Sequence, residues 1–288
     1  MHVAAATPTP TRPVLRWHGG KWLLAPWVIE HLPAHRIYVE PFGGAASVLM
    51  RKPRSYSEVY NDLDDEVVNL FGVLRSDRAN ELVDALHLTP FSRVEFDLSY
   101  EPAEDPVEKA RRLIIRSFQG FGSNGHARRT GFRANSNRSG TTPSRDWRNY
   151  PEQLAFAVDR LRGVTVEHRD ACEVMAAHDG PETLHYVDPP YLPNTRDPGG
   201  DYTHELSPED HTNLLAFLRT VQGMVVLSGY PSDTYDAALR DWHRVDRKAL
   251  ADGARARTEV LWINPRAWGR LRRQAGLFEM SPLQQTEE

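Results

Sequence analysis

The most constraining feature of this sequence is an apolar stretch, residues 184–187, that runs directly into Asp188-Pro189-Pro190-Tyr191. Each proline fixes its own φ and lacks an N–H group, and the residue before a proline is pushed toward an extended conformation. The pattern predicts a strand followed by a stiff loop, at the sheet edge where open α/β folds bind ligands. The Asp188 carboxylate, the Pro189 carbonyl group and the flat face of Tyr191 together suit a planar base that carries an amino group. A proline-rich turn after an edge strand is the alternative.

Near the start of the chain, a lysine follows two glycines just before a stretch of helical periodicity. Residues 16–22 read Arg-Trp-His-Gly-Gly-Lys-Trp, and residues 23–32 predict a helix. Exposed N–H groups, the positive end of a helix dipole and the Lys21 ammonium would together suit a carboxylate or a phosphate. The GxxxxGK[ST] spacing of a P-loop is absent. An ordinary loop is the alternative.

A second glycine turn joins a predicted strand to a predicted helix within residues 36–49. Gly43 and Gly44 would let the backbone approach a ligand closely. Glu40, at the end of the predicted strand, could bind an ammonium group. The turn lacks the GxGxxG spacing of a dinucleotide site. A β–α corner with a solvated glutamate is the alternative.

Acidic residues follow the next two predicted strands. Asp62 comes after the strand of residues 57–60, a position from which an acid can accept hydrogen bonds from ribose hydroxyl groups. Asp64 instead predicts a helix cap. Asp170 follows the strand of residues 164–167 and could either accept from an adenine amino group or cap a helix.

The composition changes between residues 76 and 159. Three short helical patterns, over residues 79–86, 93–100 and 107–118, give way to an arginine-rich and glycine-rich stretch that reaches residue 150. A loop of this length inside a compact protein is typical of a functional or a disordered segment. Because arginine suits phosphates and guanine edges and asparagine suits adenine edges, the stretch predicts a DNA-binding insert. A flexible surface loop is the alternative. The candidate DNA contacts are Arg128, Arg129, Arg133, Asn135 and Arg138.

The tetrapeptide at residues 188–191 resembles the catalytic motif of amino-group DNA methyltransferases. Its setting resembles the Dam-like adenine methyltransferases, especially their phage and prophage members, over roughly residues 15–265. The segment Glu40-Pro41-Phe42-Gly43-Gly44 resembles the first motif of that family, and Trp17-His18-Gly19-Gly20-Lys21 resembles its N-terminal segment. The family usually has Ser-Asn where this chain has Ser228-Gly229, so a side-chain contact there is lost or moved.

The resemblance implies an α/β fold, namely a Rossmann-like methyltransferase with a seven-stranded mixed sheet and an inserted, mostly helical target-recognition domain. Residues 14–75 and 160–270 would form the catalytic domain, and residues 76–159 the insert. The implied methyl donor is S-adenosyl-L-methionine (SAM). The residues expected to bind SAM are Trp17, Lys21, Glu40, Phe42, Gly43, Gly44, Asp62, Asp170 and Asp188.

The implied reaction moves a methyl group from SAM to the exocyclic N6 amino group of adenine in double-stranded DNA, after the base has left the duplex. Asp188 and the Pro189 carbonyl group would accept the amino hydrogens, Pro190 would stiffen the loop, and Tyr191 would stack on the base. Positioning and electrostatics would suffice, with no metal. Cytosine N4 is an alternative acceptor, and a catalytically silent DNA-binding relative is an alternative role. A nicotinamide-dependent oxidoreductase, RNA methylation and protein glutamine methylation are less favoured.

Composition and net charge limit which classes of protein and of site are possible for this chain. The net charge of −4 does not by itself indicate nucleic-acid binding. Cys172 is the single cysteine, which excludes an internal disulfide and a cysteine-rich zinc site. No run approaches the roughly 18 apolar residues that a membrane span needs, and a cytoplasmic protein of a bacterial or phage-infected cell is expected. Residues 1–13 predict a disordered tail, and residues 271–288 a second tail. A monomer is favoured, and a restriction endonuclease encoded nearby is left open as a partner.

Overall fold

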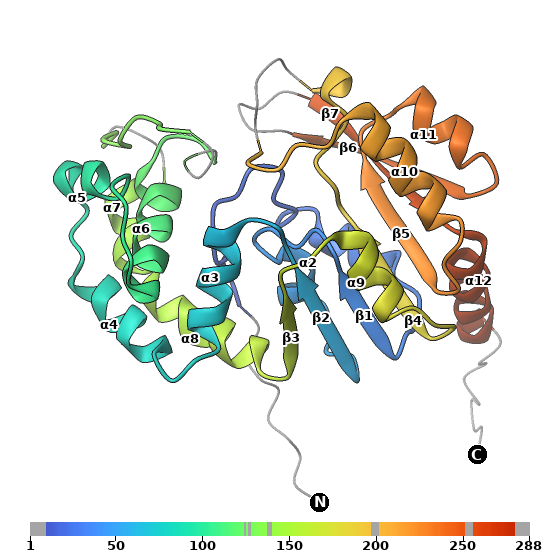
Figure 1. The fold of residues 1–288 in the computed structure, drawn as a ribbon, viewed down its shortest axis with the longest axis horizontal. Helices are drawn as coiled ribbons and strands as arrows, with labels where there is room; N and C mark the ends of the chain where they lie inside the picture. The colour runs from blue at the N-terminus through green and yellow to red at the C-terminus, as the bar shows by residue number, and fades with distance from the viewer. Residues whose placement is uncertain are drawn as a thin grey trace, which may run out of the picture.

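The computed structural model describes residues 10–123, 125, 128–136, 140–196, 202–250 and 256–279. Within these residues the chain forms a seven-stranded sheet in the order β3-β2-β1-β4-β5-β7-β6 (Figure 1). Neighbouring strands are parallel except at β7, which runs antiparallel to both β5 and β6. The predicted mixed sheet is therefore confirmed. The strands are β1 (Ile37–Glu40), β2 (Ser57–Asn61), β3 (Val164–Glu167), β4 (Thr183–Val187), β5 (Met224–Gly229), β6 (His243–Leu250) and β7 (Ala256–Ile263).

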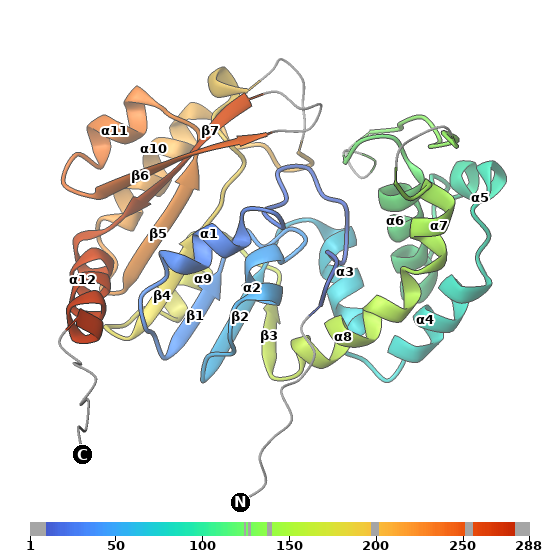
Figure 2. The same ribbon diagram turned by 180° about the vertical axis from the view of Figure 1, so that it is seen from behind.

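Helices cover both faces of the sheet because its central strands are apolar on both sides. Successive side chains of a strand point to opposite faces. Tyr38 and Tyr186 accordingly belong to one hydrophobic cluster, whereas their neighbours Val39 and Val187 belong to another. Figure 1 shows α9, α10 and α11 in front of the sheet, and Figure 2 shows α1 and α2 in front of the opposite face. These helices are α1 (Ala25–Glu30), α2 (Ser47–Arg51), α9 (Ala171–Ala177), α10 (Pro208–Leu218) and α11 (Asp233–Ala238).

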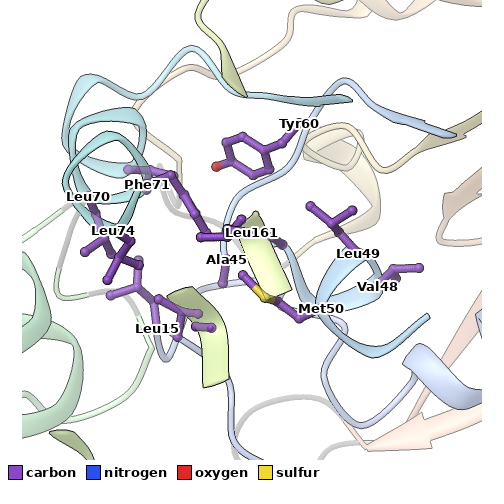
Figure 3. Packing of buried hydrophobic residues seen from close by; sticks show 14 of the residues in the cluster. Leu15, Ala45, Val48, Leu49, Met50, Tyr60, Leu70, Phe71, Leu74 and Leu161 are labelled. Atoms are coloured by element: carbon purple, nitrogen blue, oxygen red, sulfur yellow. The ribbon is translucent and has the colours of Figure 1, made fainter. Parts of the chain in front are cut away.

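Helix α3 (Asp65–Leu74) packs on the sheet through large side chains (Figure 3). The rings of Tyr60 on β2 and Phe71 on α3 lie with their centroids 4.5 Å apart. Leu15 and Leu161 are buried in the same cluster. Each fully buried side chain of this kind stabilises the fold by about 1.5–3 kcal/mol, so this contact fixes α3 and the loop that precedes it.

A helical lobe stands beyond the β3 edge of the sheet (Figures 1 and 2). In sequence it lies between α3 and β3, where the insert was predicted, and the three predicted helices correspond to α4, α5 and α6. The hydrophobic cluster that contains Tyr60 continues into the lobe at Leu113 and Tyr150. The lobe therefore shares a core with one face of the sheet. Its helices are α4 (Ala79–Leu88), α5 (Arg93–Leu98), α6 (Pro106–Gln119), α7 (Pro143–Arg148) and α8 (Pro151–Leu161).

Helix α7 lies within the stretch that was predicted to be irregular, so that prediction was wrong there. Pro143 occupies the first turn, and the Thr142 side chain caps the helix by accepting from the Arg145 N–H group. Trp147 is only 4% exposed and donates its indole N–H group to the Thr89 carbonyl oxygen at 2.8 Å. Trp147 therefore belongs to the core of the lobe.

A buried ion cluster ties α8 to β2. Arg160 donates to both Glu58 carboxylate oxygens, at 2.6 and 2.9 Å, and the Lys52 ammonium donates to the same carboxylate at 2.7 Å. All three side chains are buried. A buried charge that loses its partner costs about 3–5 kcal/mol, so this cluster holds the base of the lobe in register with the sheet.

Ordered structure extends into both of the segments that were predicted to be tails, residues 1–13 and 271–288. Residues 1–9 lie outside the described residues, but Thr11 already donates to the Gln153 side chain on α8 at 2.6 Å. At the other end, helix α12 (Pro265–Glu279) continues well past residue 270 and is anchored by the buried Ala267. None of the helices in the described ranges combines the length and the apolar character that crossing a bilayer requires.

Candidate functional site

A cavity of about 250 Å³ opens at the carboxyl ends of β1, β2 and β4. Parallel strands bring their carboxyl ends to one edge of the sheet, so loops that are distant in sequence meet there. Two predicted site residues, Tyr191 and Asp170, do not line this cavity. The predicted residues that do line it are Trp17, Lys21, Glu40, Phe42, Gly43, Gly44, Asp62, Asp188, Pro189 and Pro190.

The glycine turn after β1 leaves no room for side chains. A Cβ atom on Gly43 would lie 2.1 Å from Cε2 of Tyr60, and one on Gly44 would lie 2.7 Å from Nε1 of Trp17. Gly44 also has a φ of +46°, a left-handed conformation that glycine adopts without strain. The turn therefore carries bare backbone along one wall of the cavity.

Glu40 ends β1 inside the cavity and is 2% exposed. Its Oε2 atom accepts from the Tyr38 hydroxyl group at 2.7 Å and from the Leu49 N–H group at 3.0 Å. Among the described residues no donor reaches Oε1. Burial raises the pKa of Glu40 to about 8, and the negative charge of Asp188 adds to the rise. A positively charged group beside Oε1 would reverse this effect and ionise the carboxyl group.

Asp62 follows β2 and holds the glycine turn in place. Its Oδ2 atom accepts from the Gly44 N–H group at 2.7 Å, and its Oδ1 atom accepts from the Asp64 N–H group at 2.9 Å. Burial raises the pKa of Asp62, although the two N–H donors oppose the rise. Asp64 caps α3 by accepting from the Glu66 and Val67 N–H groups, as the sequence predicts.

Asp188 follows β4 and forms a buried ion pair with Lys21. The Lys21 ammonium lies 3.0 Å from Asp188 Oδ1 and donates to the Gly19 carbonyl oxygen at 2.6 Å. Burial alone would lower the pKa of Lys21, but the carboxylates of Asp188 and Glu259 outweigh it and raise the pKa above its ordinary value. Lys21 therefore stays charged, and its charge is directed at Asp188 rather than at an open anion site.

The ring of Tyr191 is buried next to the cavity. Tyr191 is 6% exposed, and its hydroxyl group donates to Glu259 Oε2 at 2.9 Å. Tyr230 meets the ring edge-on with centroids 4.6 Å apart, and the Lys21 ammonium lies 4.7 Å from the ring centroid. The expected stacking of this ring on a base stays a prediction.

Two contacts of the site could not be assigned from sequence, because each joins the loop after β4 to a strand that is distant in sequence, β5 or β7. Ser228 on β5 donates to Asp188 Oδ1 at 2.6 Å. Glu259 on β7 is 8% exposed and fixes Tyr191. The available signal for Glu259 was an acidic residue directly before the apolar run of residues 260–263. At Gly229, where the resembled family usually has asparagine, a Cβ atom would lie 3.1 Å from the Trp262 ring, so that ring fills the position.

Asp170 caps α9, which was one of its two predicted roles. Its side chain is exposed and accepts from the Cys172 and Glu173 N–H groups at 2.9 and 3.1 Å. The neighbouring Ala171 lines the cavity, so Asp170 lies at its margin.

The candidate DNA contacts lie on the helical lobe. Arg128, Arg129 and Asn135 are exposed, and Arg133 is half-buried, with its guanidinium donating to the Phe118 carbonyl oxygen at 3.1 Å. Arg129 forms an ion pair with Asp97 of α5 at 2.7 Å. Arg138 lies outside the described residues. Across the described ranges, no three His, Cys, Asp or Glu side chains come together in a way that could hold a metal ion.

Comparisons with known proteins agree on one family. Residues 17–250 match the model of the D12 class N6 adenine-specific DNA methyltransferases. The chain is 28% identical over 246 residues to a DNA adenine methylase of Serratia marcescens, a match that covers 81% of this chain and 87% of that protein. It is 26% identical over 189 residues to a DNA adenine methylase of Vibrio cholerae serotype O1 and 25% identical over 192 residues to one of Escherichia coli strain K12. Each of these two matches covers 63% of this chain and 66% of the relative.

Proposed function

Because this chain belongs to the D12 class N6 adenine-specific DNA methyltransferase family, and is therefore an adenine-specific DNA methyltransferase, we propose that its cavity binds SAM and that Asp188 and Pro189 hold the target adenine beside it. The observation that carries this proposal is that Glu40, Asp62 and Asp188, which lie at the carboxyl ends of three different strands, line a single cavity. The glycine turn and the rings of Trp17 and Phe42 line the same cavity.

The charges of the lining fit SAM, which carries a positive sulfonium, a positive ammonium and a negative carboxylate. Glu40 has an Oε1 atom that receives no donor among the described residues, and it suits the ammonium group. Asp62 already holds the glycine turn through both oxygens and retains lone pairs for the ribose hydroxyl groups. Trp17 and Phe42 supply apolar surface. Asp170 lies at the margin of the cavity, and its proposed role is to accept a hydrogen bond from the adenine amino group of SAM.

The residues of this chain would position the target amine. When bound, SAM supplies a methyl group on a positively charged sulfur. Asp188 and the Pro189 carbonyl group accept the two amino hydrogens of the flipped adenine, which increases the electron density on N6 and aims its lone pair. The transfer would form the N6–carbon bond as the bond from that carbon to sulfur breaks, and N6 would release one proton to solvent. Catalysis of this kind depends on positioning and electrostatics, and a misplacement of about 1 Å costs about 100-fold in rate.

We assign target recognition to the helical lobe, residues 76–159, and catalysis to residues 14–75 and 160–270. DNA is the substrate of the family, and the arginines on the lobe are placed to neutralise phosphates. Double-stranded DNA of a bacterial cytoplasm is the expected target, and a monomer the expected form. Arg128, Arg129 and Arg133 would contact the backbone, and Asn135 would suit an adenine edge.

The test is methyl transfer to unmethylated duplex DNA in the presence of SAM, followed by digestion to nucleosides and mass spectrometry. The expected product is N6-methyladenine, and Asp188→Ala should produce none. Sequencing the modified DNA would give the recognition site. A folded protein that binds SAM without modifying DNA would overturn the assignment of activity, and N4-methylcytosine would overturn the assignment of the acceptor.

A further inference from the structure

The carboxyl ends of β4 and β5 place one hydroxyl group against the Asp188 carboxylate. The two strands are parallel, with Val187 paired to Leu227. Asp188 and Ser228 each follow this pair by one residue, so the register itself makes them neighbours. Ser228 is 2% exposed, does not line the cavity, and has its Oγ atom 2.6 Å from Asp188 Oδ1.

The directions of the hydrogen bonds follow from the numbers of donors and acceptors. An ionised carboxylate only accepts, and a serine hydroxyl group has a single proton to donate. The Ser228 proton has two acceptors within reach, Asp188 Oδ1 at 2.6 Å and the Val187 carbonyl oxygen at 3.4 Å. The shorter, charged contact is the stronger. The Tyr186 hydroxyl group, 3.3 Å from Ser228 Oγ, must then be the donor in its own contact.

Tyr186 is suited to remain a donor. Its side chain is 1% exposed, and burial, reinforced by the negative charge of Asp188, raises its pKa well above the ordinary value. The three side chains thus form a directed chain of hydrogen bonds from Tyr186 to Ser228 to Asp188. A hydrogen bond that is donated to a charged group is roughly twice as strong as one between neutral groups.

Both donors to Asp188 reach the same oxygen atom. Lys21 and Ser228 contact Oδ1, and in the described part of the chain no donor reaches Oδ2. A carboxylate held at one oxygen by two donors cannot rotate freely about its Cβ–Cγ bond. One oxygen is therefore committed to the protein, and the other keeps its full accepting capacity.

We infer that Ser228 is a positioning residue for methyl transfer, and that the relay from Tyr186 through Ser228 to Asp188 Oδ1 presents Oδ2 to the amino group of the target adenine. The inference rests on the proposed function of Asp188. It separates two roles within one carboxylate, since Oδ1 anchors the group and Oδ2 receives the substrate hydrogen. The competing interpretation is that Ser228 only satisfies a polar position in the core.

The experiment compares the methylation kcat and the SAM affinity of four single variants, of the double variant Tyr186→Phe with Ser228→Ala, and of Asp188→Ala with those of the wild type. Ser228→Ala should lower kcat about 10- to 100-fold, the range expected when a hydrogen bond to a charged group is removed, without changing the Kd for SAM. Ser228→Cys keeps a weak donor of similar size and should fall between the wild type and Ser228→Ala. Thr183→Val is the matched control, because it removes a buried hydroxyl group at the opposite end of β4. It should leave kcat unchanged.

Tyr186→Phe distinguishes a relay from independent packing effects. It should lower kcat severalfold in the wild type and should have no further effect in Ser228→Ala, because the acceptor that connects it to Asp188 is then gone. A merely structural role of Ser228 would lower the affinity for SAM together with kcat, and the effect of Tyr186→Phe would then persist in Ser228→Ala.

The outcomes separate the inference from the function on which it rests. If the wild type methylates adenine and Asp188→Ala does not, while Ser228→Ala keeps the wild-type rate, the inference is overturned and the function stands. Independent, multiplying effects of Tyr186→Phe and Ser228→Ala would also overturn it. A wild type that cannot methylate DNA overturns both. Should Ser228→Ala fail to fold, an unchanged rate in Ser228→Cys would refute the inference.

Discussion

Replacing Glu40 by glutamine should remove a pH dependence of SAM binding that the structure builds into the cavity. Burial raises the pKa of Glu40 to about 8, so the empty site holds this group mostly protonated at neutral pH. In the proposed site the ammonium group of SAM would bind the ionised form better, because opposite charges attract strongly at a buried position. Binding of the cation must therefore include loss of a proton from Glu40.

The magnitude follows from the ionised fraction of Glu40. With the pKa at about 8, that fraction rises from about 1% at pH 6 to about 24% at pH 7.5. An α-amino group with an ordinary pKa of about 7.7 is still about 60% protonated at pH 7.5, so the affinity for SAM should rise about 15-fold across this interval. Isothermal titration calorimetry in buffers of different ionisation enthalpy would measure both the affinity and the proton released on binding.

In Glu40→Gln the affinity should be lower at pH 7.5 and nearly constant between pH 6 and 7.5. His18 and His204 also line the cavity, so the variant is needed to assign the titrating group. A wild-type affinity for SAM that is constant over this interval would show that Glu40 does not titrate on binding. A Glu40→Gln variant that retains the full pH dependence would show that the titrating group lies elsewhere.

Four further results are expected. Asp188→Ala should abolish methyl transfer in a nucleoside assay while SAM affinity stays within about tenfold, because the proposed role of the carboxylate is to hold the target base; equal loss of both would refute that role. Gly43→Ala should weaken SAM binding in calorimetry, because its Cβ would collide with Tyr60. Arg160→Ala should destabilise the fold in urea by about 3–5 kcal/mol by leaving Glu58 unpaired; a loss below 1 kcal/mol would contradict this. Replacing Arg128, Arg129 and Arg133 together by alanine should weaken DNA binding and flatten its salt dependence in anisotropy titrations.

Most of the catalytic sheet could be predicted from sequence because its signals are local. Short strand patterns followed by acidic residues predicted β2, β3 and β4 within one residue of their bounds. Helix α7 was missed because its signals, Thr142 and Pro143, stand in a polar stretch whose apolar contact, Trp147, is made with a distant segment of the lobe. A single buried side chain does not produce the repeated spacing of apolar residues by which a helix is predicted. The phage or prophage subtype of the resemblance stays a prediction.

Within the site, the residues that follow strands were predictable, whereas the residues that hold them were not. Glu40, Asp62 and Asp188 each end a strand with an acid, and parallel packing brings such ends together. Ser228 and Glu259 act through side chains that cross between strands. Their partners depend on strand order and register, which short-range patterns do not encode. The ion pair of Lys21 was likewise unexpected, because an isolated Gly-Gly-Lys indicates an anion site without naming the anion.

The buried charges of the cavity connect its stability to its ligands. Glu40 and Glu259 have raised pKa values chiefly because burial disfavours their ionised forms, and Lys21 is the ammonium placed between Asp188 and Glu259. For Glu40, the stabilisation from its protonated form is complete near pH 4 and is lost as the pH rises through about 8, since its folded pKa exceeds the unfolded one. At neutral pH Glu40 is mostly protonated in the folded empty site but ionised in the unfolded chain, so its burial weakens the fold there. A ligand whose ammonium group lies beside Glu40 lets the carboxyl group ionise, so the same arrangement that weakens the empty fold favours binding of a cation.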